Sequence, residues 1–349
     1  MKLGLNLGYW GMGNDSDNLV LAREADKLGY SVAWAAEAYG SDAATVLAWV
    51  AAQTQRIDVG SAVFQIPGRT PANTAMTAAT LDTLSGGRFR LGLGVSGPQV
   101  SEGWHGVRFD KPLARTREYV EIVRKALNRE VVRYEGVHFT LPLPDGPGRA
   151  LRMTIGPVQQ HLPIYLAAVG PKNLELAGQI ADGWLAIFYN PEFAAEQLSH
   201  IAAGRASIGK DLTGFDVCAT VPLVLGDDLA ACAAPVRAYS ALYIGGMGSR
   251  EQNFYNSLAT RMGYGEQAAA IQDAYLARSY EEAAATVPAE FIERTSLIGT
   301  PDAVRGRLHA YAEAGVGTLT VACYGATLDQ RLSDLRTVVD LLDATGLGD

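Results

Sequence analysis

Apolar segments alternate with helical patterns along the whole chain. Eight segments rich in apolar and small residues are each predicted to form a β-strand, and they cover residues 3–8, 31–36, 57–64, 89–95, 163–168, 183–188, 215–225 and 317–323. Several are almost wholly apolar, which is typical of strands buried on both faces of a parallel sheet. The segments between them place apolar residues three or four positions apart, as amphipathic helices do. Because strand and helix alternate from end to end, the sequence predicts an α/β fold.

The number of predicted strands favours a closed (β/α)8 TIM barrel over an open sheet. A barrel of this kind needs about 250 residues or more. The chain has 349 residues, which would also allow two smaller domains. Since we find no linker that divides the chain, we predict a single domain over residues 1–349.

Two connections are longer than simple crossovers require. They run from about residue 96 to 162 and from about 226 to 316. The first contains an amphipathic helix, Pro112–Leu127, and a predicted hairpin, Val131–Leu141; the second contains helices rich in Ala and Tyr, including Tyr264–Arg278. Both insertions follow strands, so both should rise from the C-terminal rim, where barrel enzymes carry their sites.

Composition and charge exclude several classes of protein. Hydrophobic residues make up 48% of the chain and charged residues 19%, which excludes a disordered chain. The 37 acidic residues outnumber the 29 basic ones and no Lys/Arg-rich run occurs, so we expect no nucleic-acid partner. No apolar stretch approaches the ~20 residues that span a bilayer, so we expect no membrane partner. The first residues resemble a strand rather than a signal peptide, and we therefore expect a cytoplasmic protein.

Cysteine and histidine spacing argues against metal and disulfide chemistry. The three cysteines are too few and too scattered for a disulfide framework. The five histidines are isolated, and no HxH or HExxH pattern occurs. We predict no metal site.

Two predicted strands end in loops of small residues that suit a bound ligand. Val95, Ser96 and Gly97 end the fourth strand, where glycine lets backbone N–H groups approach a flat or anionic ligand. Residues 168–170 (Ala-Val-Gly) end the fifth strand, and a helix begins near Pro171. A helix N-terminus favours phosphate, and Lys172 would strengthen the positive field. The alternative interpretation is two ordinary barrel turns.

Two further strand ends carry charged residues. Ser61 and Ala62 are small residues within the third strand, and the Pro/Gly stretch after it carries Arg69, which could meet an anion or be a solvated surface charge. Glu37 lies at the C-terminal end of the second strand, the usual position of a catalytic carboxylate in a barrel. Asp42 should cap the next helix. The alternative for Glu37 is a structural ion pair with a rim arginine.

Taken together, these segments resemble the bacterial luciferase-like superfamily, specifically its coenzyme F420-dependent oxidoreductases. The segments that carry the resemblance are residues 28–37 (LGYSVAWAAE), 80–94 (TLDTLSGGRFRLGLG), 112–119 (PLARTREY), 180–184 (IADGW) and 298–302 (IGTPD). The resemblance spans most of the chain. It does not by itself separate deazaflavin users from FMN users.

The resemblance implies a (β/α)8 barrel, usually a homodimer, with an isoalloxazine-type ring at its C-terminal mouth. It places a non-prolyl cis peptide, a bulge behind the ring, at Ala62–Val63. It assigns the cofactor loops to Val95, Ser96 and Gly97 and to the segment Ala168, Val169 and Gly170, with Lys172 near an anionic tail. Glu37 matches the acid that deazaflavin relatives carry, and it is our candidate catalytic residue, but Ala38 stands where those relatives often have His.

We therefore predict a coenzyme F420-dependent oxidoreductase that transfers a hydride between the deazaflavin and a small-molecule substrate. Two alternatives remain open: an FMN-dependent luciferase-like monooxygenase, and a non-catalytic flavin-binding barrel. Trp104, Tyr39, Phe188 and Trp184 are candidate apolar walls of the substrate site, or core residues. The sequence does not identify the substrate.

Overall fold

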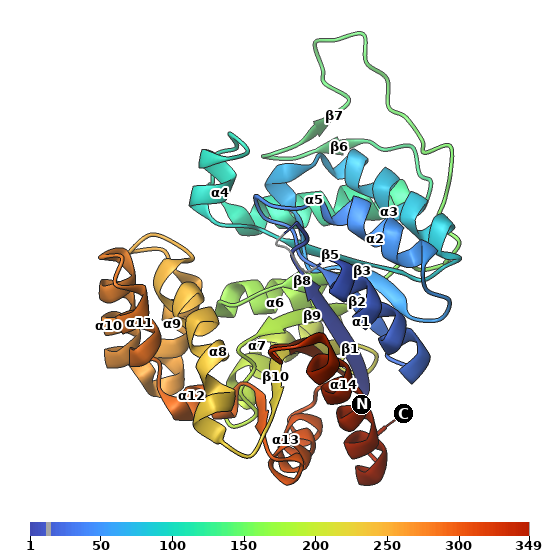
Figure 1. Cartoon of the computed structure of the whole chain (residues 1–349). Helices are drawn as coiled ribbons and strands as arrows, with labels where there is room; N and C mark the ends of the chain where they lie inside the picture. The colour runs from blue at the N-terminus through green and yellow to red at the C-terminus, as the bar shows by residue number, and fades with distance from the viewer. Residues whose placement is uncertain (12–14, 349) are drawn as a thin grey trace.

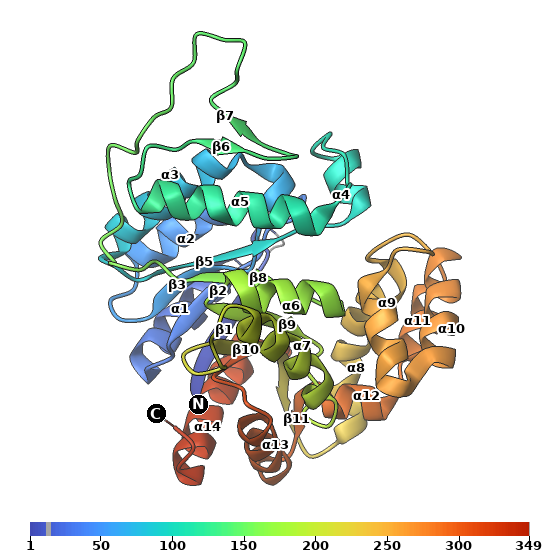
Figure 2. The same ribbon diagram turned by 180° about the vertical axis from the view of Figure 1, so that it is seen from behind.

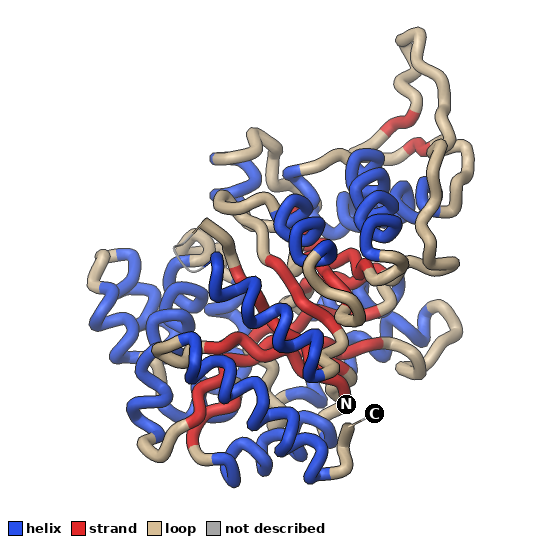
Figure 3. The backbone as a smooth tube through the Cα atoms, turned by 45° about the vertical axis from the view of Figure 1, so that its right-hand side comes forward, coloured by secondary structure: helices blue, strands red, loops and turns tan. Residues whose placement is uncertain are grey.

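Eight parallel strands close into a barrel in the computed structural model, which describes residues 1–11 and 15–348. In ring order the strands are β10 (Asp216–Leu225), β12 (Thr318–Cys323), β1 (Lys2–Gly8), β2 (Val32–Ala35), β3 (Asp58–Ser61), β5 (Phe89–Gly94), β8 (Ile164–Ala167) and β9 (Gly183–Ile187), which pairs back with β10. Each overlaps one of the eight predicted strands, so the predicted barrel is confirmed. Figure 3 shows the strands at the centre with helices outside them.

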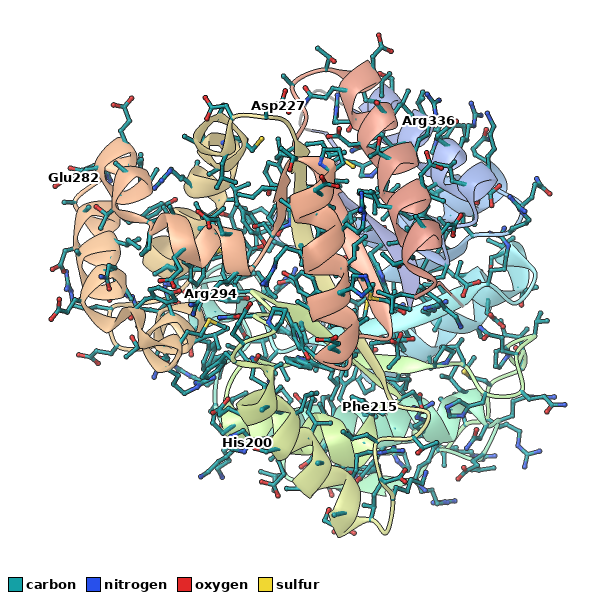
Figure 4. All side chains as sticks on the ribbon, turned by 90° about the horizontal axis from the view of Figure 1, so that it is seen from below. His200, Phe215, Asp227, Glu282, Arg294 and Arg336 are labelled. Atoms are coloured by element: carbon teal, nitrogen blue, oxygen red, sulfur yellow. The ribbon has the colours of Figure 1, made fainter. Side chains whose placement is uncertain are left out.

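Helices cover the barrel on its outer surface. Those that follow or precede the ring strands are α1 (Asp15–Leu28), α2 (Ala43–Ala52), α3 (Pro71–Ser85), α5 (Pro112–Leu127), α6 (Pro171–Ile180), α7 (Ala194–Ser207), α13 (Pro301–Glu313) and α14 (Leu328–Thr345). The main apolar core lies between strands and helices and includes Leu5, Val59 and Leu91, which are fully buried. The last and first helices are also joined at the surface, where Arg336 donates to Glu24 at 2.8 Å; Figure 4 labels Arg336 on α14.

The first insertion lies between β5 and β8. It contains α5 and a hairpin of β6 (Tyr134–Glu135) and β7 (Thr140–Leu141), as predicted, and also the short helix α4 (Pro98–Gly103), which the sequence did not predict. The segment after β7 projects from the molecule in Figure 1. Glu118 of α5 accepts hydrogen bonds from the backbone N–H groups of residues 137, 138 and 139 at 2.8, 2.8 and 3.1 Å. This carboxylate fastens the hairpin to the helix.

The second insertion lies between β10 and β12 and forms a group of helices on one side of the barrel (Figures 1 and 2). Its elements are α8 (Leu229–Ala241), η2 (Leu242–Gly246), α9 (Phe254–Ala259), η3 (Thr260–Tyr264), α10 (Gly265–Leu276), α11 (Tyr280–Thr286), α12 (Ala289–Arg294) and the strand β11 (Leu297–Gly299). A second apolar cluster, which includes Val236, Ile271 and Phe291, packs these helices together. No described helix is long and apolar enough to cross a membrane.

A buried carboxylate on α14 makes the stability of this fold depend on pH. Asp334 is 3% exposed, and its Oδ2 has no hydrogen-bond partner. Burial raises the pKa of Asp334 from 3.8 to about 6, against the opposing effect of the Leu225 N–H. Because the folded protein holds this proton more tightly than the unfolded chain, ionisation should lower the free energy of unfolding as the pH rises from about 4 to about 6. The full loss, ~3 kcal/mol, should be present at higher pH.

The Asp334→Asn variant should lack this pH-dependent loss. Its free energy of unfolding relative to wild type should rise between about pH 4 and about pH 6 and then stay constant, as measured by urea denaturation. Asp340→Asn is the matched control, because Asp340 is exposed on the same helix. If the free energy of unfolding of Asp334→Asn differs from that of wild type by the same amount at every pH, the pKa of Asp334 is not raised in the folded protein.

Candidate functional site

The loops predicted to hold a cofactor lie side by side at the C-terminal ends of three neighbouring strands. Residues 95–97 follow β5 and residues 168–170 follow β8, while Ala62 and Val63 follow β3. Since β3 pairs with β5 and β5 pairs with β8, all three loops share one side of the barrel mouth. The structure therefore brings together the residues that the sequence proposed.

A bulge separates β3 from the short strand β4 (Phe64–Gln65). Gly60 pairs with Arg90 and Phe64 pairs with Leu93, so β3–β4 uses four residues where β5 uses three. One extra residue on one strand is the definition of a β-bulge. The predicted strand 57–64 is therefore interrupted. Within the interruption the peptide bond between Ala62 and Val63 is cis, which confirms the bond type implied by the family resemblance.

A glutamine side chain connects three of the rim segments. Gln65 is buried, donates from Nε2 to the carbonyl of Ala38 at 2.6 Å, and accepts at Oε1 from the Ser96 hydroxyl at 2.9 Å. Ser96 has a φ of 63°, which is uncommon for a residue other than glycine. Gln65 thus holds Ser96 and the end of β2 in fixed positions. The sequence analysis missed Gln65; its place immediately after the small residues of the third strand was the available signal.

Glu37 is part of an ion-pair network with Arg69 and Asp42. Arg69 Nη1 binds Glu37 Oε1, Arg69 Nη2 binds Asp42 Oδ1, and Ala43 N donates to Glu37 Oε2 at 3.0 Å. The guanidinium also lies over the Phe64 ring, 4.4 Å from its centroid. Both oxygens of Glu37 are therefore occupied by donors. This is the structural alternative that the sequence allowed for Glu37, and it leaves Arg69 neutralised rather than free to meet an anion.

Asp42 caps α2, as predicted. Its Oδ2 accepts from Thr45 N at 2.8 Å. Burial acts to raise the pKa of Asp42, but the hydrogen bonds from Thr45 and the charge of Arg69 outweigh it and hold this pKa below 3.8. Asp42 therefore stays ionised, and the network carries one cation between two carboxylates.

The loop before α6 offers a positive site for an anionic group. Gly170 is the N-cap of α6 and makes no side-chain cap, so the N–H groups of the first turn meet no capping side chain. Lys172 lies exposed in this turn. Arg261, from η3, donates to the Val169 carbonyl at 2.9 Å and lies 3.6 Å from Glu196. Arg261 was not identified from the sequence, because it lies 92 positions after Val169, in the second insertion.

Of the four aromatic residues considered as walls of the substrate site, two are exposed and two are buried. Tyr39 and Trp104 are 68% and 67% exposed. Trp184 is fully buried in the main core, where its indole N–H donates to the Ala168 carbonyl at 2.8 Å. Trp184 is thus a core residue that supports the Ala168 loop, not a wall. Phe188, buried at the end of β9, has a φ of 51°.

Comparisons with known proteins agree with this architecture. The family model described as "Luciferase-like monooxygenase" matches residues 12–318. The Mycobacterium tuberculosis protein named "Putative coenzyme F420-dependent oxidoreductase" is 43% identical over 97% of this chain and 99% of its own length. The 5,10-methylenetetrahydromethanopterin reductase of Archaeoglobus fulgidus is 30% identical over 84% of this chain and 85% of its own. The structure of the coenzyme F420-dependent tetrahydromethanopterin reductase of Methanopyrus kandleri superposes with a TM-score of 0.83, at 24% identity, over 99% of both chains.

Proposed function

We propose that this chain, which belongs to the luciferase-like monooxygenase family, uses coenzyme F420 to oxidise or reduce a small organic substrate. It is a luciferase-like oxidoreductase. The observation that carries the choice of cofactor is the 43% identity to the mycobacterial protein, which extends over nearly the full length of both chains. The homodimer and the cytoplasmic location implied earlier stay predictions.

The residues of the mouth fit a flat ring with an anionic tail. Adding a Cβ at Gly94 would bring it to 2.5 Å from Val63 Cγ2, so the Val63 side chain lies directly against this glycine. A Cβ at Gly97 would meet only the end of Gln99, at 3.8 Å, so the backbone is open to close approach there. Ala62, Val63 and residues 95–97 would hold the ring. Residues 168–170, Lys172 and Arg261 would hold the anionic tail.

Coenzyme F420, when bound, supplies hydride transfer. The protein would supply orientation and exclusion of water. Gln65 and Ser96 fix the backbone of the ring loop, and the ion-pair network fixes the end of β2 beside it. We propose that Glu37 acts through this network as a positioning residue, because both of its oxygens already accept hydrogen bonds.

The Glu37→Gln variant distinguishes a positioning role for Glu37 from a role in proton transfer. Gln keeps the shape and one acceptor oxygen but cannot titrate. We expect turnover to fall by less than about 10-fold, with an unchanged pH profile, since general acid–base catalysis is worth about 10²–10⁴-fold. A fall of that larger size, with F420 affinity unchanged, would show instead that Glu37 carries a proton.

Turnover with reduced cofactor tests the proposed function against both alternatives. Purified protein is given reduced F420 and a panel of ketones, in air and under argon. We expect oxidation of reduced F420 at equal rates in both atmospheres. A requirement for reduced FMN and oxygen would identify a monooxygenase, and cofactor binding without turnover of any acceptor would favour the non-catalytic barrel.

A further inference from the structure

Four tyrosines form a connected group at the barrel mouth, and three of them contact Phe188. Tyr239, Tyr243 and Tyr255 come from the second insertion and Tyr324 follows β12. The Phe188 ring centroid lies 5.7, 5.9 and 6.4 Å from those of Tyr239, Tyr243 and Tyr255. The Tyr239 ring lies 4.8 Å from Tyr243 and 5.9 Å from Tyr324, and Tyr243 lies 4.9 Å from Tyr255. We call these four residues the tyrosine cluster.

The tyrosine cluster occupies a different part of the mouth from the cofactor loops. Phe188 follows β9 and Tyr324 follows β12, with β10 between these strands in the ring. The cofactor loops follow β3, β5 and β8. Helix α8, the turn η2 and α9 bring the other tyrosines over the β9–β12 side. A substrate that reaches the cofactor would therefore lie between the loops and the cluster.

The hydroxyl groups of the cluster have little hydrogen bonding within the protein. Across residues 1–11 and 15–348, the hydroxyl groups of Tyr255 and Tyr324 have no hydrogen-bond partner in the protein. The hydroxyl groups of Tyr239 and Tyr243 interact only with each other. All four side chains are half-buried. Tyrosine hydroxyls held in such surroundings usually find a partner, so these donors are available to a bound molecule.

Among the described residues, no charged side chain forms a hydrogen bond with a tyrosine of the cluster or a cation–π contact with its ring. Burial raises the pKa of Tyr255 to about 12 and raises that of Tyr239 and Tyr243 well above 10.0. The largest further contributions to these pKa values come from other tyrosines, including Tyr9. The phenols therefore stay neutral, and a charged substrate would lose its hydration here without gaining a counter-ion.

Phe188 is held in an uncommon backbone conformation at the centre of these rings. Its φ of 51° lies in the left-handed region, which residues other than glycine seldom adopt. Such residues concentrate at binding and active sites, where the surrounding structure fixes them. Contacts with three tyrosines and with Phe291, 5.2 Å away, hold the Phe188 side chain in place.

We propose that the tyrosine cluster is the substrate-recognition surface, and that it selects an uncharged, ring-containing ketone or alcohol whose oxygen accepts hydrogen bonds from the phenols. The inference rests on the proposed function and adds the class of substrate to it. The aromatic faces bind the apolar ring, and the free hydroxyls bind the oxygen. Anionic substrates are disfavoured because, in the described part of the chain, no Lys or Arg side chain donates to a phenol of the cluster or stacks on its rings.

Two matched probes test this inference by titration calorimetry, with and without bound F420. The neutral probe is 2-acetylnaphthalene, and 6-acetyl-2-naphthoate adds a carboxylate to the same ring ketone. We expect wild type to bind the neutral probe at least about 10-fold more tightly than the carboxylate. The double variant Tyr243→Phe/Tyr255→Phe, which keeps both rings, should bind the neutral probe about 10-fold more weakly.

Tyr280→Phe is the matched control, because Tyr280 is 53% exposed on α11 of the same insertion, the helix on which Figure 4 labels Glu282. It should bind the neutral probe as wild type does. Equal affinity for the two probes, no saturable binding of the neutral probe, or an unchanged affinity in the double variant would overturn the inference. F420 affinity is measured separately by fluorescence quenching. If wild type does not bind F420 but binds the neutral ketone in a way that depends on the tyrosines, the proposed cofactor is refuted and the inference about the cluster stands.

Discussion

Gly92→Ala should prevent folding or lower the free energy of unfolding by at least ~3 kcal/mol, the upper end of the usual cost of overpacking. A Cβ at Gly92 would lie 1.9 Å from the backbone carbonyl oxygen of Ser61 and 2.7 Å from Leu185 Cδ1. A side chain could move away, but the backbone of Ser61, which pairs with Ala35 of β2, cannot. The Ser61 hydroxyl bonds to both the N–H and the carbonyl of Gly92, at 3.0 and 2.8 Å, so the two strands are fixed at this point.

Gly97→Ala is the control for this substitution. Gly97 has a φ of −132°, which any residue can adopt, and a Cβ there would meet only Gln99 Oε1 at 3.8 Å. Its thermal midpoint should match that of wild type. If Gly97 contacts the cofactor, the same variant should bind F420 more weakly although it is fully folded. A Gly92→Ala protein with a wild-type melting temperature would refute the packing of β3 against β5 described above.

Arg69→Met should lower the free energy of unfolding by ~3 kcal/mol, since removing one partner of a buried ion pair leaves the other charge uncompensated. The side chains of Arg69 and Glu37 are only 12% and 9% exposed, whereas that of Asp42 is 49% exposed and can be solvated. Met keeps apolar contact with the Phe64 ring, so the loss reports mainly on the charge. Urea denaturation measures it.

A double-mutant cycle identifies the partner responsible. Adding Glu37→Gln to Arg69→Met should recover part of the lost stability, because it removes the uncompensated carboxylate. Adding Asp42→Asn should recover less. An exposed surface ion pair contributes less than ~1 kcal/mol to stability. If Arg69→Met lowers the free energy of unfolding by no more than that, Glu37 is not held in this network.

Local sequence patterns were sufficient for the barrel and for most of its helices. The helix predicted as Pro112–Leu127 has these same bounds in the structure, because Pro at its first position and a regular apolar face define it. The strand β11 was missed, since three residues are too few to show a periodicity. The break in the third strand was implied only by the family resemblance.

The partners of the site residues depended on tertiary structure. The sequence placed Glu37 and Arg69 at strand ends, but it could not show that one binds the other. Arg261 and three members of the tyrosine cluster come from the second insertion, whose position over the mouth no local pattern predicts. Small residues at strand ends thus predicted the loops that we propose hold the cofactor, whereas contacts between segments distant in sequence required the structure.

A comparison of the affinities for the two cofactors tests the central claim most directly. The purified protein, stripped of any bound flavin, is titrated with F420 and separately with FMN, and the quenching of each cofactor's fluorescence is followed. The account predicts saturable F420 binding at least about 10-fold tighter than that of FMN. Tight binding of FMN with no response to F420 would contradict it.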